Sequence, residues 1–129
     1  MASVVLERPL RCTAEHAWRL LRNFGAASKA FPDVLTESRA EGEERVVTFA
    51  NGMVVRERLV TMDHERRRVA YAVVGGRFSQ HAAAMQIIEM GGECLFHWVS
   101  DFLPDSFEPM VRGLMEQGAA SFARVAEDG

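Results

Sequence analysis

The sequence predicts an α+β fold in which a curved antiparallel sheet of six or seven strands wraps around a long C-terminal helix. Apolar residues alternate with polar ones from about Val34 to Phe102, and turn signals at Asn51-Gly52, residues 63–66 and Gly91-Gly92 divide this stretch into hairpins. The apolar stripe of residues 107–125 then has helical spacing. A helix this amphipathic must cover a sheet face, so we expect a mostly apolar ligand pocket between the two.

The N-terminal elements follow from local signals. Val4–Leu6 is short, apolar and β-branched, which predicts a strand that Pro9 closes. Thr13 is placed to cap a helix that runs through Phe24 and ends at Gly25. At the first sheet hairpin, Asn-Gly predicts a type I′ turn, because that turn needs two positive φ angles.

Composition and charge limit the classes of function that this chain could have. The 129 residues fit one domain spanning 1–129, and 48% hydrophobic residues exclude a disordered chain. The net charge of −3 gives no footprint for nucleic acid, and no apolar run is long enough to cross a membrane. Cys12 and Cys94 fit neither a metal motif nor a disulfide framework, so we expect reduced thiols, a cytoplasmic protein, no metal and no cofactor.

Four segments together are similar to one known family. They are Ala17–Phe24, Glu57–Leu59, Tyr71–Gly76 and Ala123–Glu127. Their order and spacing resemble the START-like SRPBCC superfamily, above all its bacterial members labelled polyketide cyclase/dehydrase or lipid-transport-like, and more distantly the plant abscisic-acid receptors. The resemblance implies the helix-grip fold of the birch-pollen allergen, with a cavity that holds hydrophobic ligands; some members are enzymes and others carry or sense.

The resemblance to the receptors also implies which positions surround the cavity. These positions are Phe31, Val46, Val55, Glu57, Tyr71, Phe78, Ala83, His97, Met110, Leu114 and Gly118, and we add His81 because it shares a strand face with Ala83. Phe31 replaces the lysine that anchors the hormone carboxylate in the receptors, and Ala83 and Gly118 replace a tyrosine and an asparagine. Abscisic acid is therefore not expected as the ligand.

Glu57 and His97 are the main candidates for chemistry. A carboxylate that faces a cavity must be paired or neutralised, so Glu57 either contacts ligand, transfers protons or pairs with a neighbour. The resemblance turns His97 inward, whereas hydrophobicity alone turns Phe96 and Trp98 inward. If His81 converged with Glu57 and His97, the three could also transfer protons.

Two glycines interrupt the last helix, where each costs about 1 kcal/mol relative to alanine. Gly118 falls on the row of Met110 and Leu114, so we expect it to make room for ligand or for the sheet, whereas Gly113 has no evident role. Tyr71, the only tyrosine, would add an aromatic wall and one hydroxyl.

Three functions fit these observations. The first is binding of a small hydrophobic ligand that is lipid-, polyketide- or isoprenoid-like. The second is a polyketide cyclase/dehydratase-type enzyme that uses Glu57 or His97 for proton transfer. The third is a homodimeric interaction protein with an incidental cavity, which exposed Phe96, Trp98 or Phe102 on the outer sheet face would favour.

Overall fold

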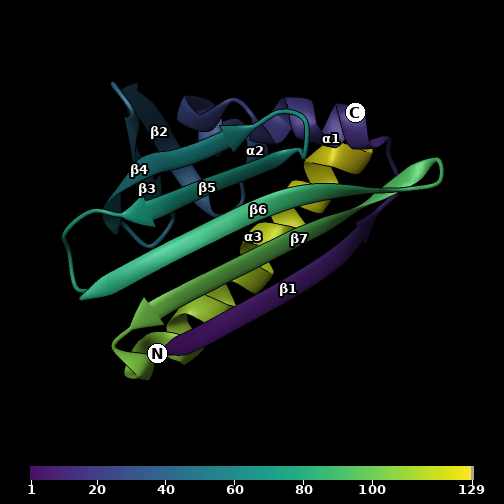
Figure 1. Cartoon of the computed structure of the whole chain (residues 1–129). Helices are drawn as coiled ribbons and strands as arrows, with labels where there is room; N and C mark the ends of the chain where they lie inside the picture. The colour runs from purple at the N-terminus through teal and green to yellow at the C-terminus, as the bar shows by residue number, and fades with distance from the viewer. Residues whose placement is uncertain (129) are drawn as a thin grey trace.

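The computed structural model describes residues 1–128, which form a seven-stranded antiparallel sheet with one long helix across it (Figure 1). The elements in chain order are β1 Ala2–Leu10, α1 Ala14–Leu21, η1 Phe24–Ala26, α2 Ala27–Ala30, β2 Leu35–Glu41, β3 Glu44–Phe49, β4 Val54–Asp63, β5 Arg68–Val73, β6 Gln80–Met90, β7 Glu93–Leu103, η2 Asp105–Phe107 and α3 Glu108–Asp128.

The strand order is β1-β7-β6-β5-β4-β3-β2, so β2 to β7 form a meander, and the last strand, β7, also pairs with the N-terminal strand β1. In Figure 1 the helix α3 lies behind β6, β7 and β1, and the short helices α1 and α2 lie near its C-terminal end. The predicted α+β helix-grip fold is confirmed. The expectation of six or seven strands resolves to seven because the segment from Leu35 to Glu41 is a full strand.

The first strand is longer than its sequence suggested. β1 pairs with β7 through Leu10, so Pro9 lies within the strand, opposite Leu95, and does not end it. β1 is an edge strand, where proline is tolerated because one side of the backbone needs no ladder hydrogen bonds.

The first helix begins as predicted and ends earlier. Thr13 is the N-cap, and its Oγ1 accepts a hydrogen bond from the backbone N–H of His16 at 3.2 Å. The helix ends at Leu21, whereas Gly25 belongs to the following 3-10 turn. A Cβ on Gly25 would lie 2.8 Å from the Cβ of Ala40, so glycine is required there by the close approach of β2.

The turn between β3 and β4 also differs from the prediction. Gly52 has a positive φ of 92°, but Asn51 does not, so this is not a type I′ turn. Asn51 instead accepts a hydrogen bond at its Oδ1 from the N–H of Met53 at 2.9 Å. The resulting register places Arg45 opposite Glu57.

The core lies between the inner sheet face and α3. Phe96, Trp98 and Phe102 of β7 are buried on this face, and Phe122 of α3 lies with its ring centroid 4.8 Å from that of Phe96. Phe31 joins them, with its ring 5.8 Å from Trp98 and 5.5 Å from Phe122. Aromatic rings therefore close the space under the C-terminal half of α3.

The two glycines of α3, Gly113 and Gly118, should respond differently to substitution by alanine. A Cβ on Gly113 meets nothing within 4 Å, so Gly113→Ala should raise the unfolding free energy by about 1 kcal/mol through helix propensity. A Cβ on Gly118 would lie 3.0 and 3.1 Å from two ring carbons of the buried Trp98, so Gly118→Ala should lose that gain to crowding. Urea denaturation of both variants measures the difference; equal stabilisation would contradict the packing role of Gly118.

Candidate functional site

The cavity between the inner sheet face and α3 has a volume of about 890 Å³, within the range of small-molecule sites. Its walls come from β2 to β7, α2, η2 and α3. Most side chains that line it are apolar, including the following: Phe31, Leu35, Val47, Phe49, Met53, Val55, Phe78, Met85, Phe107, Val111, Leu114 and Met115. The cavity has the size and lining of a site for an apolar molecule of drug-like dimensions.

Ten of the twelve predicted positions line this cavity. They are Phe31, Val46, Val55, Glu57, Tyr71, Phe78, His81, Met110, Leu114 and Gly118. Ala83 is buried on the same strand face, but its methyl group lies between the larger Tyr71 and the Ser100 position and is not part of the lining.

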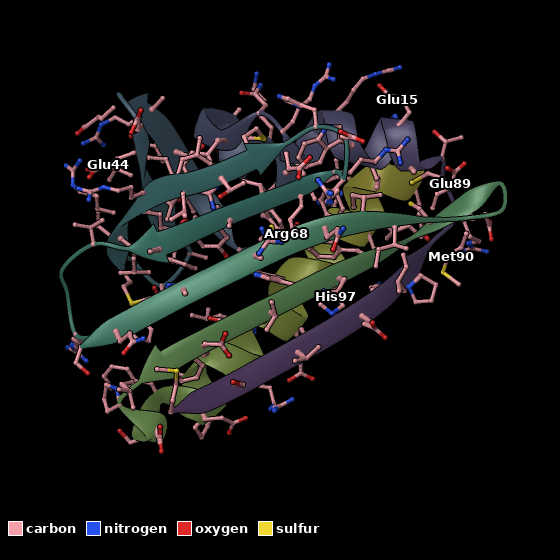
Figure 2. The ribbon with its side chains drawn as sticks, viewed as in Figure 1. Glu15, Glu44, Arg68, Glu89, Met90 and His97 are labelled. Carbon is pink, nitrogen blue, oxygen red and sulfur yellow. The ribbon has the colours of Figure 1, made fainter. Side chains whose placement is uncertain are left out.

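The prediction that His97 faces the cavity is wrong. His97 pairs with Glu7 on β1 and Gln86 on β6, and its Nε2 lies 3.9 Å from Oε2 of Glu7. Figure 2 shows His97 on the face of the sheet turned to the viewer, with α3 behind the sheet. Because strand side chains alternate, the burial of the neighbours Phe96 and Trp98 forces His97 outward.

The convergence of Glu57, His81 and His97 fails for the same reason, since His97 lies on the opposite face of the sheet. No group of three or more His, Cys, Asp or Glu side chains able to hold a metal ion occurs within residues 1–128. The remaining two, Glu57 and His81, each have a protein partner in the cavity wall.

Glu57 forms a buried ion pair with Arg45, a residue that the sequence analysis did not single out. The Nε of Arg45 donates to Oε1 of Glu57 at 2.7 Å, and its Nη1 donates to the carbonyl oxygen of Phe24 at 3.1 Å. The guanidinium lies 3.9 Å from the ring centroid of Phe24 and 5.0 Å from that of Tyr71. Structural pairing, one of the three alternatives for Glu57, is therefore present.

His81 is held in one neutral tautomer. Its Nδ1 accepts a hydrogen bond from the backbone N–H of Val73 at 3.1 Å, so the ring proton resides on Nε2. Nε2 lies 3.2 Å from Oγ of Ser100 and donates to it. Burial lowers the pKa of His81 from 6.5, although the charge of Glu57 opposes this effect. The Ser–His pair thus lacks a free base nitrogen, and His81 cannot activate Ser100 as a nucleophile.

Tyr71 and Trp98 form the second polar pair of the wall. The Nε1 of Trp98 donates to the Tyr71 hydroxyl at 3.2 Å, and both side chains are buried. Burial, together with the nearby charge of Glu57, raises the pKa of Tyr71, so its hydroxyl keeps its proton. Trp98 faces inward as its hydrophobicity indicates, whereas Ser100 was not predicted as a site residue, although the strict alternation of β7 places it on the face of Phe96.

The open side of the cavity carries three arginines. Arg39 donates to Glu41 at 2.9 Å, and Arg56 donates to Glu41 and Glu44 at 2.9 and 3.0 Å. Arg77 is exposed there and pairs with no carboxylate in the described part of the chain. The charge at the mouth is thus largely neutralised within the protein.

The sequence matches the family described as polyketide cyclase/dehydrase and lipid transport over residues 1–127. The chain belongs to this family. Its membership, with the fold described above, confirms the resemblance to the START-like SRPBCC superfamily. No curated protein matches the sequence.

Solved structures share the fold at low sequence identity. An uncharacterised protein from Bacillus thuringiensis has a TM-score of 0.88 and 18% identity, covering 97% of this chain and 98% of its own. The protein XoxI from Bacillus cereus has a TM-score of 0.84 and 17% identity, covering 99% and 94%. Norcoclaurine synthase from Thalictrum flavum, in complex with dopamine and hydroxybenzaldehyde, has a TM-score of 0.77 and 15% identity, covering 96% and 85%.

The structure also bears on two other features, membrane-spanning helices and exposed aromatic residues. None of the helices within residues 1–128 is long and apolar enough to span a membrane. The aromatic residues whose exposure would have favoured a homodimer are turned inward, with exposed fractions of 1% for Phe96, 9% for Trp98 and 0% for Phe102.

The buried ion pair predicts a non-additive mutant cycle. Arg45→Met and Glu57→Leu should each destabilise the protein by about 3 to 5 kcal/mol, because each leaves one charge buried without its partner. The double variant should be more stable than either single variant, because no charge then remains. Urea denaturation of the four proteins tests this, and additive losses would show that the two charges do not depend on each other.

His81 predicts a loss of stability in mild acid. Its pKa in the folded protein lies below 6.5, so the unfolded chain binds more protons as the pH falls through that value. The unfolding free energy should therefore decline from about pH 6.5 downward, and His81→Gln should show a shallower decline. Denaturation at pH 8, where the imidazole is neutral in both states, isolates the packing cost of the substitution. If the unfolding free energy fell equally with pH in the two proteins, His81 would not be the cause of the decline.

Proposed function

We propose that this protein binds a small hydrophobic ligand, lipid-, polyketide- or isoprenoid-like, in the cavity between the sheet and α3. The observation that carries the proposal is a cavity of about 890 Å³ with a mostly apolar lining, in which the buried polar side chains Glu57, Tyr71, His81 and Ser100 each have a protein partner. Such a surface favours an apolar molecule over water, because water needs two to four polar partners.

Family membership supports the same proposal. The family description includes lipid transport, and a norcoclaurine synthase of this fold forms a complex with two small aromatic molecules. The alternative enzyme would use Glu57 or His97 for proton transfer; His97 lies on the sheet face away from the cavity, and Glu57 is already paired with Arg45. The exposed aromatic residues that would have favoured a homodimer are in fact buried, so ligand binding is the function best supported.

The two cysteines, Cys12 and Cys94, support a proposal for where the protein resides. Burial raises the pKa of both thiols, to about 12 for Cys94, so neither is readily ionised at neutral pH. We place the protein in the cytoplasm, where such thiols stay reduced, and treat residues 1–129 as a single ligand-binding domain without a nucleic-acid partner.

Native mass spectrometry of the protein as purified tests the proposal most directly. We expect a mass excess from a co-purified small molecule, which organic extraction should release. Leu114→Trp should abolish the excess, because Leu114 lines the cavity and an indole would fill it. Leu20→Trp is the matched control, since Leu20 is also half-buried on a helix but lies outside the lining. An excess that persists in Leu114→Trp would place the ligand elsewhere.

Binding of an added probe gives a second measurement. 2-Isopropenylnaphthalene, an apolar molecule of suitable size, should bind the extracted protein with an affinity that Leu114→Trp weakens at least about tenfold, equivalent to about 1.4 kcal/mol. The Leu20→Trp control should bind it like the unaltered protein. Equal binding by all three proteins would contradict the cavity as the binding site.

A further inference from the structure

Two residues with hydroxyl groups, Tyr71 and Ser100, line the cavity. Tyr71 on β5 and Ser100 on β7 both pair with Ala83 of the intervening strand, so all three share the inner sheet face. The small side chain of Ala83 lets the Tyr71 ring extend over β6 toward β7, where its hydroxyl meets Nε1 of Trp98. The ring of His81 joins the two groups, because its centroid lies 6.1 Å from that of Tyr71 and its Nε2 lies 3.2 Å from Oγ of Ser100.

Each hydroxyl receives a hydrogen bond from a group that can only donate. The indole N–H of Trp98 is a donor without acceptor capacity, and it occupies a lone pair of the Tyr71 oxygen. The backbone N–H of Val73 fixes His81 with its proton on Nε2, so this nitrogen is likewise a donor and occupies a lone pair of the Ser100 oxygen.

The hydrogens of the two hydroxyls are then left to donate. Within residues 1–128 neither hydroxyl donates to a protein acceptor, although both residues are at least 95% buried and both line the cavity. A buried donor without an acceptor is costly, so this wall is complementary to a group that offers lone pairs.

The charge around the hydroxyls selects a neutral acceptor. The cation beside the Tyr71 ring, Arg45, is already occupied by Glu57, by the carbonyl of Phe24 and by the rings of Phe24 and Tyr71. A carboxylate ligand would enter this wall without a free cation and close to the charge of Glu57, and its desolvation would be uncompensated. A ketone, ester or similar carbonyl oxygen accepts two hydrogen bonds without bringing charge.

We propose that the hydroxyls of Tyr71 and Ser100 form a paired donor site for a neutral carbonyl oxygen of the hydrophobic ligand. The inference rests on the proposed function and specifies its ligand: an apolar, uncharged molecule that carries a carbonyl group. Trp98 and His81 are positioning residues, because each directs the hydroxyl proton of its partner toward the cavity without touching the ligand oxygen.

A pair of isosteric probes tests this site. 2-Acetylnaphthalene and 2-isopropenylnaphthalene have nearly the same shape, but only the first carries a carbonyl. By titration calorimetry, Tyr71→Phe and Ser100→Ala should each weaken the ketone about three- to tenfold and leave the alkene nearly unchanged. Ser121→Ala is the matched control, because Ser121 is equally buried, lies outside the cavity and donates nothing to it, and this variant should bind both probes normally.

An infrared measurement on the unaltered protein does not depend on the folding of any variant. The carbonyl stretching band of bound 2-acetylnaphthalene should lie at lower frequency than in an apolar solvent, because two O–H groups donate to the oxygen. The band should move back toward the apolar value in Tyr71→Phe, in Ser100→Ala and, through reorientation of the Ser100 hydroxyl, in His81→Phe.

The outcomes separate this inference from the proposed function. If both probes bind but each substitution weakens them equally, or if the carbonyl band stays at its apolar frequency, the donor pair is overturned and the apolar cavity stands. If neither probe binds, the donor pair is also overturned, and the mass spectrum of the purified protein decides independently whether the cavity holds a ligand.

Discussion

The register of β7 is the constraint on which the rest of the structure depends. With Phe96, Trp98 and Phe102 buried on the inner face, the side chains that alternate with them, including His97, must face outward. Trp98 then becomes the point where the sheet meets α3, because its ring carbons would lie 3.0 and 3.1 Å from a Cβ on Gly118. A slip of one residue would remove the contact with α3 and the partner of the Tyr71 hydroxyl together.

This register also explains why the interior divides into a packed part and a hollow part. Phe31, Phe96, Trp98 and Phe122 fill the space under the C-terminal half of α3. Under its N-terminal half, Leu114 is only half-buried and Met110 is exposed, and both border the cavity. An unfilled apolar volume lowers the stability of the folded chain. The packing of the aromatic cluster offsets part of this loss when no ligand is bound.

The elements of the fold were predictable because they depend on local sequence. Thr13 marks a helix start and Gly91-Gly92 marks a hairpin, whatever the surrounding structure. The partner of Glu57 was not predictable in this way. A two-residue type I′ turn at residues 51–52 would have placed Val46 opposite Glu57, whereas the turn that forms shifts the register by one residue and brings Arg45 there. The error over His97 had another origin, since the family resemblance outweighed the burial of Phe96 and Trp98, which was the stronger physical signal.

The polar side chains of the cavity share one feature. Their protein partners leave no unpaired charge on this wall, but hydroxyl groups that can still donate a hydrogen bond remain. Arg45 neutralises Glu57, and the rings of Phe24 and Tyr71 cover the guanidinium. His81 is kept uncharged by burial and by the N–H of Val73. A ligand that reaches this wall therefore meets hydroxyl donors but no free ion, and an ionic group would be more stable at the mouth, beside the exposed Arg77. The same pairing that stabilises the folded chain thus makes the interior favour uncharged molecules, so the stability of the cavity wall and its selectivity depend on the same contacts.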